Sequence, residues 1–423
     1  MSNPTLNDLF DQSSPYFNGA INLPLPPSSK NVFTDGIDPK AIGDPQAAAN
    51  ITNVGLSVAT VTLDSTDSIQ KAIDYLATIG GGVIRLNAGT HTPPGNVTFP
   101  VKTPIQIVGV NMTSAIIDFG SADRRFILAG SNIYTTGTVS ISSGVTVTGS
   151  STGWLTSGLV AGDEIFLDSR WYKIDTIAGD TTIILAEGYG GTALSGATYR
   201  ASSIVRDVEF TEITIKNSTS SSGAIDGDDC RNVLLEDITL VSNNVNISMT
   251  NFSEWNSQRT VSAAATGNGA AFTTGTFCNN YQFASVGNGA HAFVLNGLMS
   301  ASFLFCAANG NTGDGFNITS CANLDVLVQA NSNGGQGIEL VSGNKNIKLN
   351  QCEASYNTSD GVKFTATSDY CKIIACHLEL NGGYGVNIAA STCDYNHLAL
   401  STFLTNTSGN YNDSGTNTVL IGV

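Results

Sequence analysis

Four short segments between residues 315 and 388 repeat one pattern: a glycine, an apolar residue, a polar residue and a second apolar residue. They are Gly315-Phe-Asn-Ile, Gly337-Ile-Glu-Leu, Gly361-Val-Lys-Phe and Gly385-Val-Asn-Ile. Their glycines recur every ~22–24 residues. A near-constant period of this length is typical of a solenoid, in which each coil of the chain stacks on the one before it.

A second series of residues has nearly the same period, every ~22–26 residues. It consists of Asn309, Asn331, Asn357, Asn381 and Asn406. Short alternating strands, such as 324–328 and 346–349, lie between the two series. Coils of this length with three short strands predict a parallel β-helix, in which equivalent side chains stack about 4.8 Å apart. We expect the glycines and asparagines to turn the chain in the left-handed conformation, which these two residues adopt most easily.

The composition agrees with a sheet-rich chain and excludes some partners. Only 12% of the 423 residues are charged, so the Lys, Glu and Arg that usually cover helix surfaces are scarce. The net charge of −16 argues against nucleic acid and anionic membrane as partners, because both attract clustered basic residues. No apolar run approaches the ~20 residues of a membrane-spanning helix. We therefore expect neither nucleic-acid binding nor membrane insertion.

Eight cysteines lie in the second half of the chain, and none forms a CxxC pair. The start of the sequence has no basic and apolar segments of a secretion signal. Both observations favour free, buried thiols in a chain made in a cytosol. The four histidines are scattered without metal-ligand spacing, so the sequence predicts no metal site and no cofactor.

Residues 55–134 are expected to form a capping helix and the first coils. A glycine triplet at 80–82 would end the helix, and the cap candidates are residues 64–67. Such a helix would cover the open end of the strand stack. Four apolar residues have the i, i+3, i+4, i+7 spacing of an amphipathic helix: Ile69, Ala72, Ile73 and Leu76.

This segment resembles a known family. Asp67-Ser-Ile-Gln-Lys-Ala-Ile-Asp74, then Gly80-Gly-Gly-Val-Ile-Arg-Leu-Asn-Ala-Gly-Thr90, then Ile107-Val-Gly-Val-Asn are similar to the first segment of pectate-lyase-like right-handed parallel β-helices. Phage tailspikes and many polysaccharide-degrading enzymes share that segment. The Gly-Asp-Gly usual before the helix is replaced by Val61-Thr-Leu-Asp-Ser. The resemblance implies an all-β, right-handed parallel β-helix of the tailspike type, and the segment contains no catalytic residue of the family.

Two further regions differ from the coils. Residues 1–54 hold seven of the 11 prolines within their first 50 positions, which predicts an extended N-terminal arm. Residues 135–202 contain short alternating stretches between Gly and Asp turns, which predict an inserted antiparallel barrel or sandwich of about five strands. Its Trp and Tyr rings would form either a sugar platform or, as we favour, the core of this small domain. Residues 203–423 then form the parallel β-helix.

Three carboxylates, Asp226, Asp228 and Asp229, are the candidate catalytic residues. Glycoside hydrolysis requires two carboxyl groups beside the scissile bond, and crowding would keep one of them protonated. The Gly227-Asp-Asp segment resembles the Asp-Asp motif of polygalacturonase-type β-helix hydrolases, although their Gly-His-Gly and Arg-Ile-Lys motifs are absent. The alternative, which we favour, is a turn between two coils, with Arg231 paired locally.

The segment 252–259 lies in the longest gap between coils and is expected to protrude. It supplies the candidate carbohydrate-binding residues Glu254, Trp255 and Arg259, since an exposed Trp stacks on sugar rings. Trp255 could equally pack against a neighbouring subunit. Four lysines on neighbouring coils predict a solvated basic face, with an anionic-glycan groove as the alternative: Lys345, Lys348, Lys363 and Lys372.

The order of arm, helix, insertion and β-helix is similar to that of phage tailspikes. The resemblance implies a virion-associated spike or fibre, expected to be a homotrimer, whose arm docks on other tail proteins. The β-helix would then bind host-surface polysaccharide, with or without depolymerase activity. Two alternatives stay open: a soluble, extracellular polysaccharide lyase or glycoside hydrolase, and a decoration protein without a ligand, because fold alone does not decide function.

Overall fold

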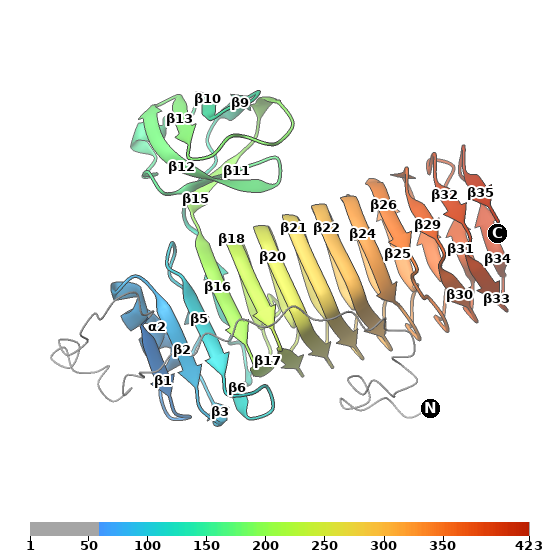
Figure 1. Ribbon diagram of the computed structural model, residues 1–423, viewed down its shortest axis with the longest axis horizontal. Coiled ribbons are helices and arrows are strands. Elements are labelled where there is room, and N and C mark those ends of the chain that lie inside the picture. The colour runs from blue at the N-terminus through green and yellow to red at the C-terminus, as the bar shows by residue number, and fades with distance from the viewer. Residues whose placement is uncertain (1–58, 423) are drawn as a thin grey trace, which may run out of the picture. The chain divides into compact units, whose positions relative to one another are not determined.

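The computed structural model describes residues 59–422. The expected arm, residues 1–54, therefore lies outside the described residues. Most of the described chain is one stack of parallel strands (Figure 1), with 25 strands in a single hydrogen-bonded sheet. The predicted parallel β-helix is confirmed. No helix among the described residues is long and apolar enough to cross a membrane.

The β-helix strands before the inserted domain are β1 Thr60–Leu63, β2 Gly82–Leu86, β3 Gly89–His91, β4 Val97–Thr98, β5 Ile105–Gly109, β6 Ala115–Ala122 and β7 Phe126–Ala129. Those after it begin with β16 Val205–Thr211, β17 Thr214–Ser218, β18 Ile225–Glu236, β19 Thr239–Val241, β20 Ile247–Ala263, β21 Ala270–Val286 and β22 Phe293–Asn309. The last coils contain β23 Phe316–Thr319, β24 Ala322–Gln329, β25 Ile338–Ser342, β26 Asn344–Asn350, β27 Val362–Phe364, β28 Ser368–Asp369, β29 Lys372–Ile374, β30 His377–Glu379, β31 Tyr384–Ile388, β32 His397–Ala399, β33 Thr402–Leu404, β34 Gly409–Asp413 and β35 Val419–Ile421.

The first coil is covered by helix α2, Ile69–Thr78, as the periodicity predicts. Its buried face consists of the four predicted apolar residues, and it packs against β2. The N-cap is Ser68, whose hydroxyl accepts from the backbone N–H of Lys71 at 3.3 Å. The predicted cap position among residues 64–67 was wrong by one residue. A Ser at the N-cap satisfies one of the free N–H groups of the first turn.

Register places like side chains above one another inside the β-helix. Phe293 pairs with Phe316, and their rings stack with centroids 4.6 Å apart. Trp255 and Phe272 are not paired in register, but their rings also pack in the core, edge to face with centroids 5.3 Å apart. Each ring buried in this way contributes roughly 2–3 kcal/mol to the free energy of unfolding.

The repeated glycines are required for a different reason from the one expected. A Cβ on Gly337 would lie 2.6 Å from the carbonyl oxygen of Gly361, and one on Gly315 would lie 2.5 Å from that of Gly337. None of these three glycines has a positive φ. They are required because successive coils approach too closely for a side chain, so the predicted left-handed turn at these positions was wrong.

The asparagines form a buried ladder that sequence spacing located only in part. In every member but the last, the side-chain Nδ2 donates to the Oδ1 of the next member at 2.8–3.0 Å, and the backbone N–H donates to the same oxygen. None is left-handed, which corrects the expectation. Asn309 and Asn331 were assigned to this ladder wrongly, since they occupy a separate position. The members are Asn288, Asn311, Asn333, Asn357, Asn381 and Asn406.

A second sheet lies between β7 and β16 in the chain and has eight antiparallel strands, where the sequence predicted about five. Its own core contains Trp154, Tyr172, Tyr189 and Tyr199, so these rings are core residues and not a sugar platform. We call it the inserted domain. Its strands are β8 Ser131–Tyr134, β9 Thr138–Ile141, β10 Thr146–Ser150, β11 Glu164–Leu167, β12 Arg170–Gly179, β13 Thr182–Leu185, β14 Leu194–Ala197 and β15 Arg200–Ser203.

All eight cysteines are free and buried, as predicted. Cys352 and Cys376, one coil apart, are each 1% exposed and lie in the apolar core. Burial raises the pKa of Cys306 to about 12, so this thiol stays protonated at neutral pH. The cysteines act as small apolar core residues.

Candidate functional site

The three candidate carboxylates lie within strand β18, so the predicted turn between coils was wrong. The strand bends locally at Asp229, whose φ of 58° is left-handed. Arg231 does not pair with these carboxylates either, as the turn interpretation required. Its guanidinium donates instead to Glu254 and Glu164.

Each of the three carboxylates is bonded to an arginine. Arg125 Nε donates to Asp226 Oδ2 at 2.9 Å. Arg200 donates from Nε to Asp229 Oδ1 at 2.5 Å and from Nη2 to Asp228 Oδ2 at 3.3 Å. Because Arg200 belongs to β15, these bonds join the inserted domain to the β-helix.

Asp229 has the raised pKa of a general acid but lacks the exposure that a general acid needs to contact its substrate. Burial raises its pKa to about 6, although the hydrogen bond from Arg200 acts in the opposite direction. The Asp229 side chain has no exposed area, and its second oxygen accepts from Ser202 at 3.4 Å. Asp226 is 25% exposed and Asp228 46% exposed. Only Asp228 is therefore well placed to contact a ligand in this structure.

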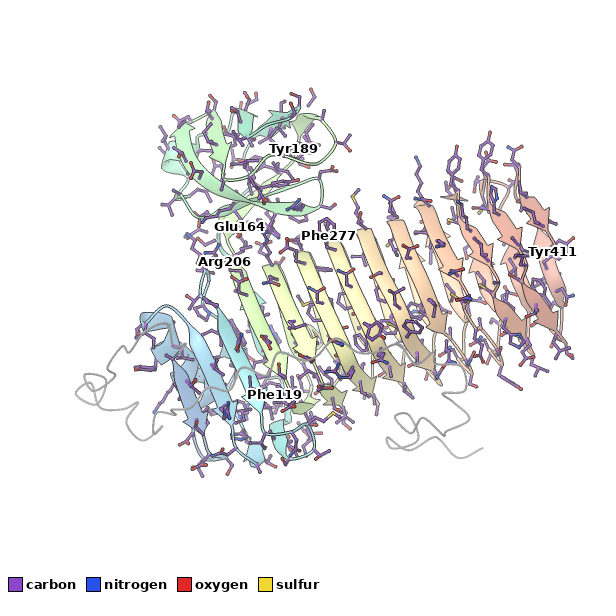
Figure 2. All side chains as sticks on the ribbon, in the orientation of Figure 1. Phe119, Glu164, Tyr189, Arg206, Phe277 and Tyr411 are labelled. Carbon is purple, nitrogen blue, oxygen red and sulfur yellow. The ribbon has the colours of Figure 1, made fainter. Side chains whose placement is uncertain are left out.

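A second charged group lies at the same junction (Figure 2). Glu164 of β11, with a side chain 2% exposed, is 3.3 Å from the guanidinium of Arg231 and 3.6 Å from that of Arg206. Burial raises the pKa of Glu164, while Arg231 acts to lower it. Arg231 also donates to both oxygens of Glu254 at 3.1 Å. Removing one partner would leave a buried charge unpaired, which costs roughly 3–5 kcal/mol.

Uncharged contacts complete this junction. The indole of Trp171 is fully buried, and its Nε1 donates to the carbonyl of Asn251 in β20 at 2.8 Å. Thr276 of β21 donates to the carbonyl of Ser169. Asp228, Asp229 and Glu254 thus belong to a structural junction between the inserted domain and the coils of β18, β20 and β21, whereas Asp226 accepts from Arg125 within the β-helix.

The other two candidates from 252–259 are also engaged within the protein. Trp255 lies in β20, has 0% exposure and donates from Nε1 to Asn280 Oδ1 at 3.2 Å. The expected protruding loop was therefore wrong, and this ring is not available to a sugar. Arg259 donates to both oxygens of Asp237, at 2.6 and 2.8 Å, and to Glu236 at 2.6 Å. The expected long gap does not exist, because Ile247 pairs with Ala270 and Ala270 with Phe293, so this coil has 23 residues like the next one.

One corner of the β-helix carries a column of side chains that the sequence did not reveal. Every member has a left-handed φ between 53° and 59°, and the members occupy equivalent positions in successive coils. They are Asp207, Asn232, Glu254, Phe277, Ser300, Asn323, Asn346, Tyr370, Tyr395 and Asn417. The inserted domain approaches the column at Phe277, whose centroid lies 5.8 Å from the Arg170 guanidinium.

Beyond the inserted domain the column is open and presents two tyrosines. Tyr370 and Tyr395 are 48% and 46% exposed, and their rings are parallel within 8° with centroids 5.2 Å apart. Asn346 Nδ2 donates to Asn323 Oδ1 at 2.7 Å, a bond that uses neither the Asn346 oxygen nor the Asn323 amide nitrogen. The Lys345 ammonium lies 5.9 Å from the Tyr370 centroid. We call these five residues the tyrosine–asparagine strip.

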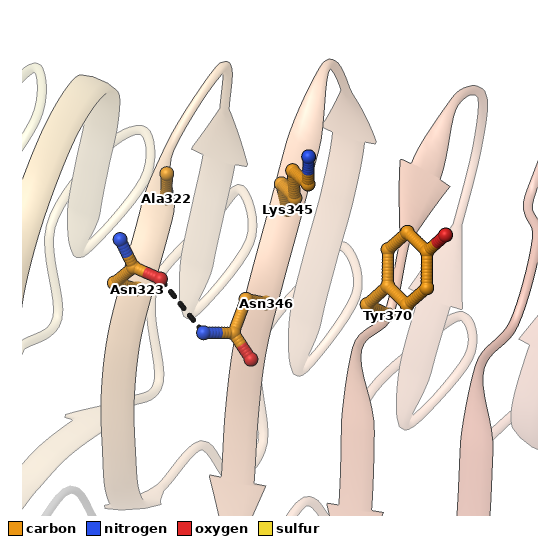
Figure 3. Close-up of a pocket in the computed structure, with 5 residues that line it drawn as sticks. All are labelled: Ala322, Asn323, Lys345, Asn346 and Tyr370. Carbon is orange, nitrogen blue, oxygen red and sulfur yellow. Dashed lines mark hydrogen bonds between the residues drawn. The ribbon is translucent and has the colours of Figure 1, made fainter. Parts of the chain in front are cut away.

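Four residues of the strip line an open depression (Figure 3). Its walls are Ala322, Asn323, Lys345, Asn346 and Tyr370, and its volume is ≈ 520 Å³. That volume lies within the roughly 300–1,000 Å³ of small-ligand sites. An amphipathic ring, a cation and amide groups are the features that bind a polyhydroxylated ring. The only sequence signal was the recurrence, every ~22–25 residues, of Asn323, Asn346, Tyr370 and Tyr395.

The expected basic face divides into two parts. Lys348 pairs in register with Lys372 on the face that follows the strip, with Lys345 at its edge. Lys363 lies on a different face, in β27, paired in register with Glu339. A single strip of four lysines was therefore wrong. Among residues 59–422 no three His, Cys, Asp or Glu side chains are grouped so that they could hold a metal ion.

Comparison with known proteins supports the fold. No protein-family model and no curated protein sequence matched the chain. Among solved structures, the A-module of mannuronan C-5 epimerase AlgE4 from Azotobacter vinelandii is similar, with a TM-score of 0.55, 14% identity, and coverage of 84% of this chain and 96% of that one. The catalytic domain of a GH87 α-1,3-glucanase in complex with nigerose has a TM-score of 0.51, 10% identity, and coverage of 88% and 69%. At these identities the likeness establishes a shared fold, the parallel β-helix.

Proposed function

We propose that this chain is a virion-associated tailspike or fibre protein that binds a host-surface glycan through the tyrosine–asparagine strip. The observation that carries the binding site is the exposed, parallel pair Tyr370 and Tyr395 beside amide groups and a lysine. The association with a virion is supported by the similarity of the chain's order to that of tailspikes. We also propose a homotrimer and attachment to other tail proteins through residues 1–54.

The chemistry of the strip favours a saccharide over a protein partner. Tyr370 borders the depression and is stacked on Tyr395, and the Lys345 ammonium lies over its ring, 5.9 Å from the centroid. A pyranose presents C–H groups to such a ring and hydroxyls at its edge, which suit the Asn346 oxygen and the Asn323 amide nitrogen. The two solved structures of shared fold are, by their names, an epimerase of mannuronan and a glucanase. Polysaccharides are therefore the first ligands to test.

The test compares Tyr370→Ala with Tyr356→Ala. Tyr356 is a matched control, because it is also left-handed, with a φ of 59°, and 54% exposed, but it lies on another corner. Binding would be screened on a glycan array and measured with the purified polysaccharide that the wild type binds. We expect Tyr370→Ala to weaken binding about fivefold or more and Tyr356→Ala to leave it unchanged. Absence of any glycan binding by the wild type, or equal losses in both variants, would contradict the proposal.

A soluble polysaccharide lyase or hydrolase is the second candidate. The observation that favours it is the exposed Asp228 beside Asp229, whose pKa is raised to about 6. This candidate predicts release of reducing ends or unsaturated products from the bound polysaccharide, and loss of release in Asp228→Asn. Release without loss in that variant would remove Asp228 from consideration.

A further inference from the structure

We infer that the depression of the tyrosine–asparagine strip takes an acidic sugar unit, such as a uronic acid, whose anionic group is bound by Lys345. The inference rests on the proposed glycan-binding function and adds the charge of the ligand to it. It is carried by three observations: the ion pairing of the cations in the described chain, the hydrogen bonds of the nearby carboxylates, and the position of the Lys345 ammonium.

Most cations in the described chain are already neutralised. Seven of the 16 Lys and Arg residues form no ion pair within residues 59–422, and the exposed Lys345 and Lys372 are among these seven. Lys348 is bound only loosely, with its Nζ 3.9 Å from Asp325. Six arginines pair with carboxylates: Arg125, Arg170, Arg200, Arg206, Arg231 and Arg259. In a chain with a net charge of −16, the unpaired Lys345 beside the Tyr370 ring forms a local site for an anion.

Two carboxylates next to the strip, Asp369 and Asp394, accept hydrogen bonds within the coils. Asp369 Oδ1 accepts the backbone N–H of Asp394 at 3.0 Å. Asp394 Oδ1 accepts the backbone N–H of Tyr395 at 3.0 Å and the side chain of Asn417 at 2.9 Å. Neither carboxylate forms an ion pair with Lys345 in the described chain, although Asp369 and Lys345 are paired in register. The remaining acid of this face, Asp325, is 67% exposed and interacts with Lys348.

Lys345 is placed to reach a ligand on Tyr370. Its ammonium lies 5.9 Å from the Tyr370 centroid, and both residues line the depression together with Asn346 (Figure 3). A pyranose that lies against Tyr370 in the depression would therefore have an anionic substituent within reach of Lys345. Its hydroxyls would face the Asn323–Asn346 pair. An exposed pair of opposite charges contributes roughly 0.2–1 kcal/mol, which corresponds to as much as about fivefold in affinity.

The experiment compares acidic polysaccharides with neutral forms of the same backbone. The probes are polygalacturonate, alginate and hyaluronate, each together with its carboxyl-reduced product, titrated into the full-length protein by calorimetry at low and high salt. We expect at least one acidic form to bind about threefold to fivefold more tightly than its reduced form at low salt. Lys345→Met should abolish that difference while keeping the aliphatic stem of the side chain. Lys363→Met, on another face, should preserve it.

The outcomes separate the inference from the proposed function. Equal binding of the acidic and reduced forms, or an unchanged preference in Lys345→Met, would overturn the inference and leave glycan binding intact. If Lys363→Met lost the preference for the acidic form as much as Lys345→Met does, the inference would also be overturned. The preference would then depend on the net charge of the protein and not on Lys345. Binding of neither form of any probe, with no signal on a glycan array, would overturn the proposed function and the inference together.

Discussion

Arg200 Nε lies 2.5 Å from Asp229 Oδ1, and this bond joins the last strand of the inserted domain to β18 of the β-helix. Each residue also has one further partner: Arg200 donates to Asp228, and Asp229 accepts from Ser202. The bond shows how carboxylates that are close together in the sequence can stabilise the structure by binding arginines. Asp228 and Asp229 bind the Arg200 guanidinium where two sheets of different architecture meet, and Asp226 binds Arg125 within the β-helix.

The raised pKa of Asp229 predicts a pH-dependent stability. Burial raises it to about 6 in the folded protein, above the value of about 3.9 for an exposed Asp. The folded state therefore binds this proton more tightly than the unfolded state between about pH 4 and 6. The contribution of Asp229 to the free energy of unfolding is fully present below about pH 4 and is lost as the pH rises through about 6.

Asp229→Asn removes this titration. We expect the melting temperature of the variant, relative to wild type, to rise steadily as the pH is raised from about 4 to 7, as measured by thermal unfolding over a pH series. Asp325→Asn, at a 67% exposed position, is the control and should show a nearly constant difference. A constant difference for Asp229→Asn would show that its pKa is not raised.

The asparagine ladder predicts a large effect from one buried amide. In Asn357→Ala, the Nδ2 and backbone N–H of Asn333 lose their acceptor, and Asn381 and the carbonyl of Ala330 lose a donor. We expect a loss of about 3 kcal/mol in the free energy of unfolding, measured in urea. Asn279→Ala, at an exposed position without a positive φ, should cost about 0.5 kcal/mol or less. Similar losses in both would contradict a ladder of satisfied amides.

The close approach of coils predicts that Gly337 cannot be replaced. In Gly337→Ala the new Cβ would lie 2.6 Å from the Gly361 oxygen and 2.8 Å from the Ala354 Cβ, so the coils must separate. We expect a loss of about 2–3 kcal/mol in the free energy of unfolding by urea titration. Gly188→Ala, where no atom lies within 4 Å, should be near neutral. A neutral Gly337→Ala would show that the contact is not needed.

Spacing in the sequence was sufficient for the fold because the β-helix is nearly periodic. Gly315, Gly337 and Gly361 marked the same position in three coils, and the apolar residues after them pointed inward in each. The asparagine ladder was assigned partly to the wrong residues, because Asn309 lies only two positions from the true member Asn311. A shift of two residues cannot be detected from sequence spacing, because the length of a coil itself varies by as much.

The candidate site could not be predicted for a related reason. Which side chains meet depends on the register between coils and on where the inserted domain docks, and neither is local in sequence. Asp229 and Arg200 are 29 residues apart, and Glu164 and Arg231 are 67 apart. Trp255 was placed outside because an expected long gap between coils was interpreted as a loop, whereas β20 alone spans 17 residues.

The most direct test of the account is a crystal structure of the protein with an oligosaccharide that the wild type binds in solution. The account predicts a sugar ring against Tyr370 in the depression, hydrogen-bonded to Asn346 and with any acidic group at Lys345. A fully occupied oligosaccharide bound elsewhere on the β-helix, with the depression at Tyr370 empty, would contradict it.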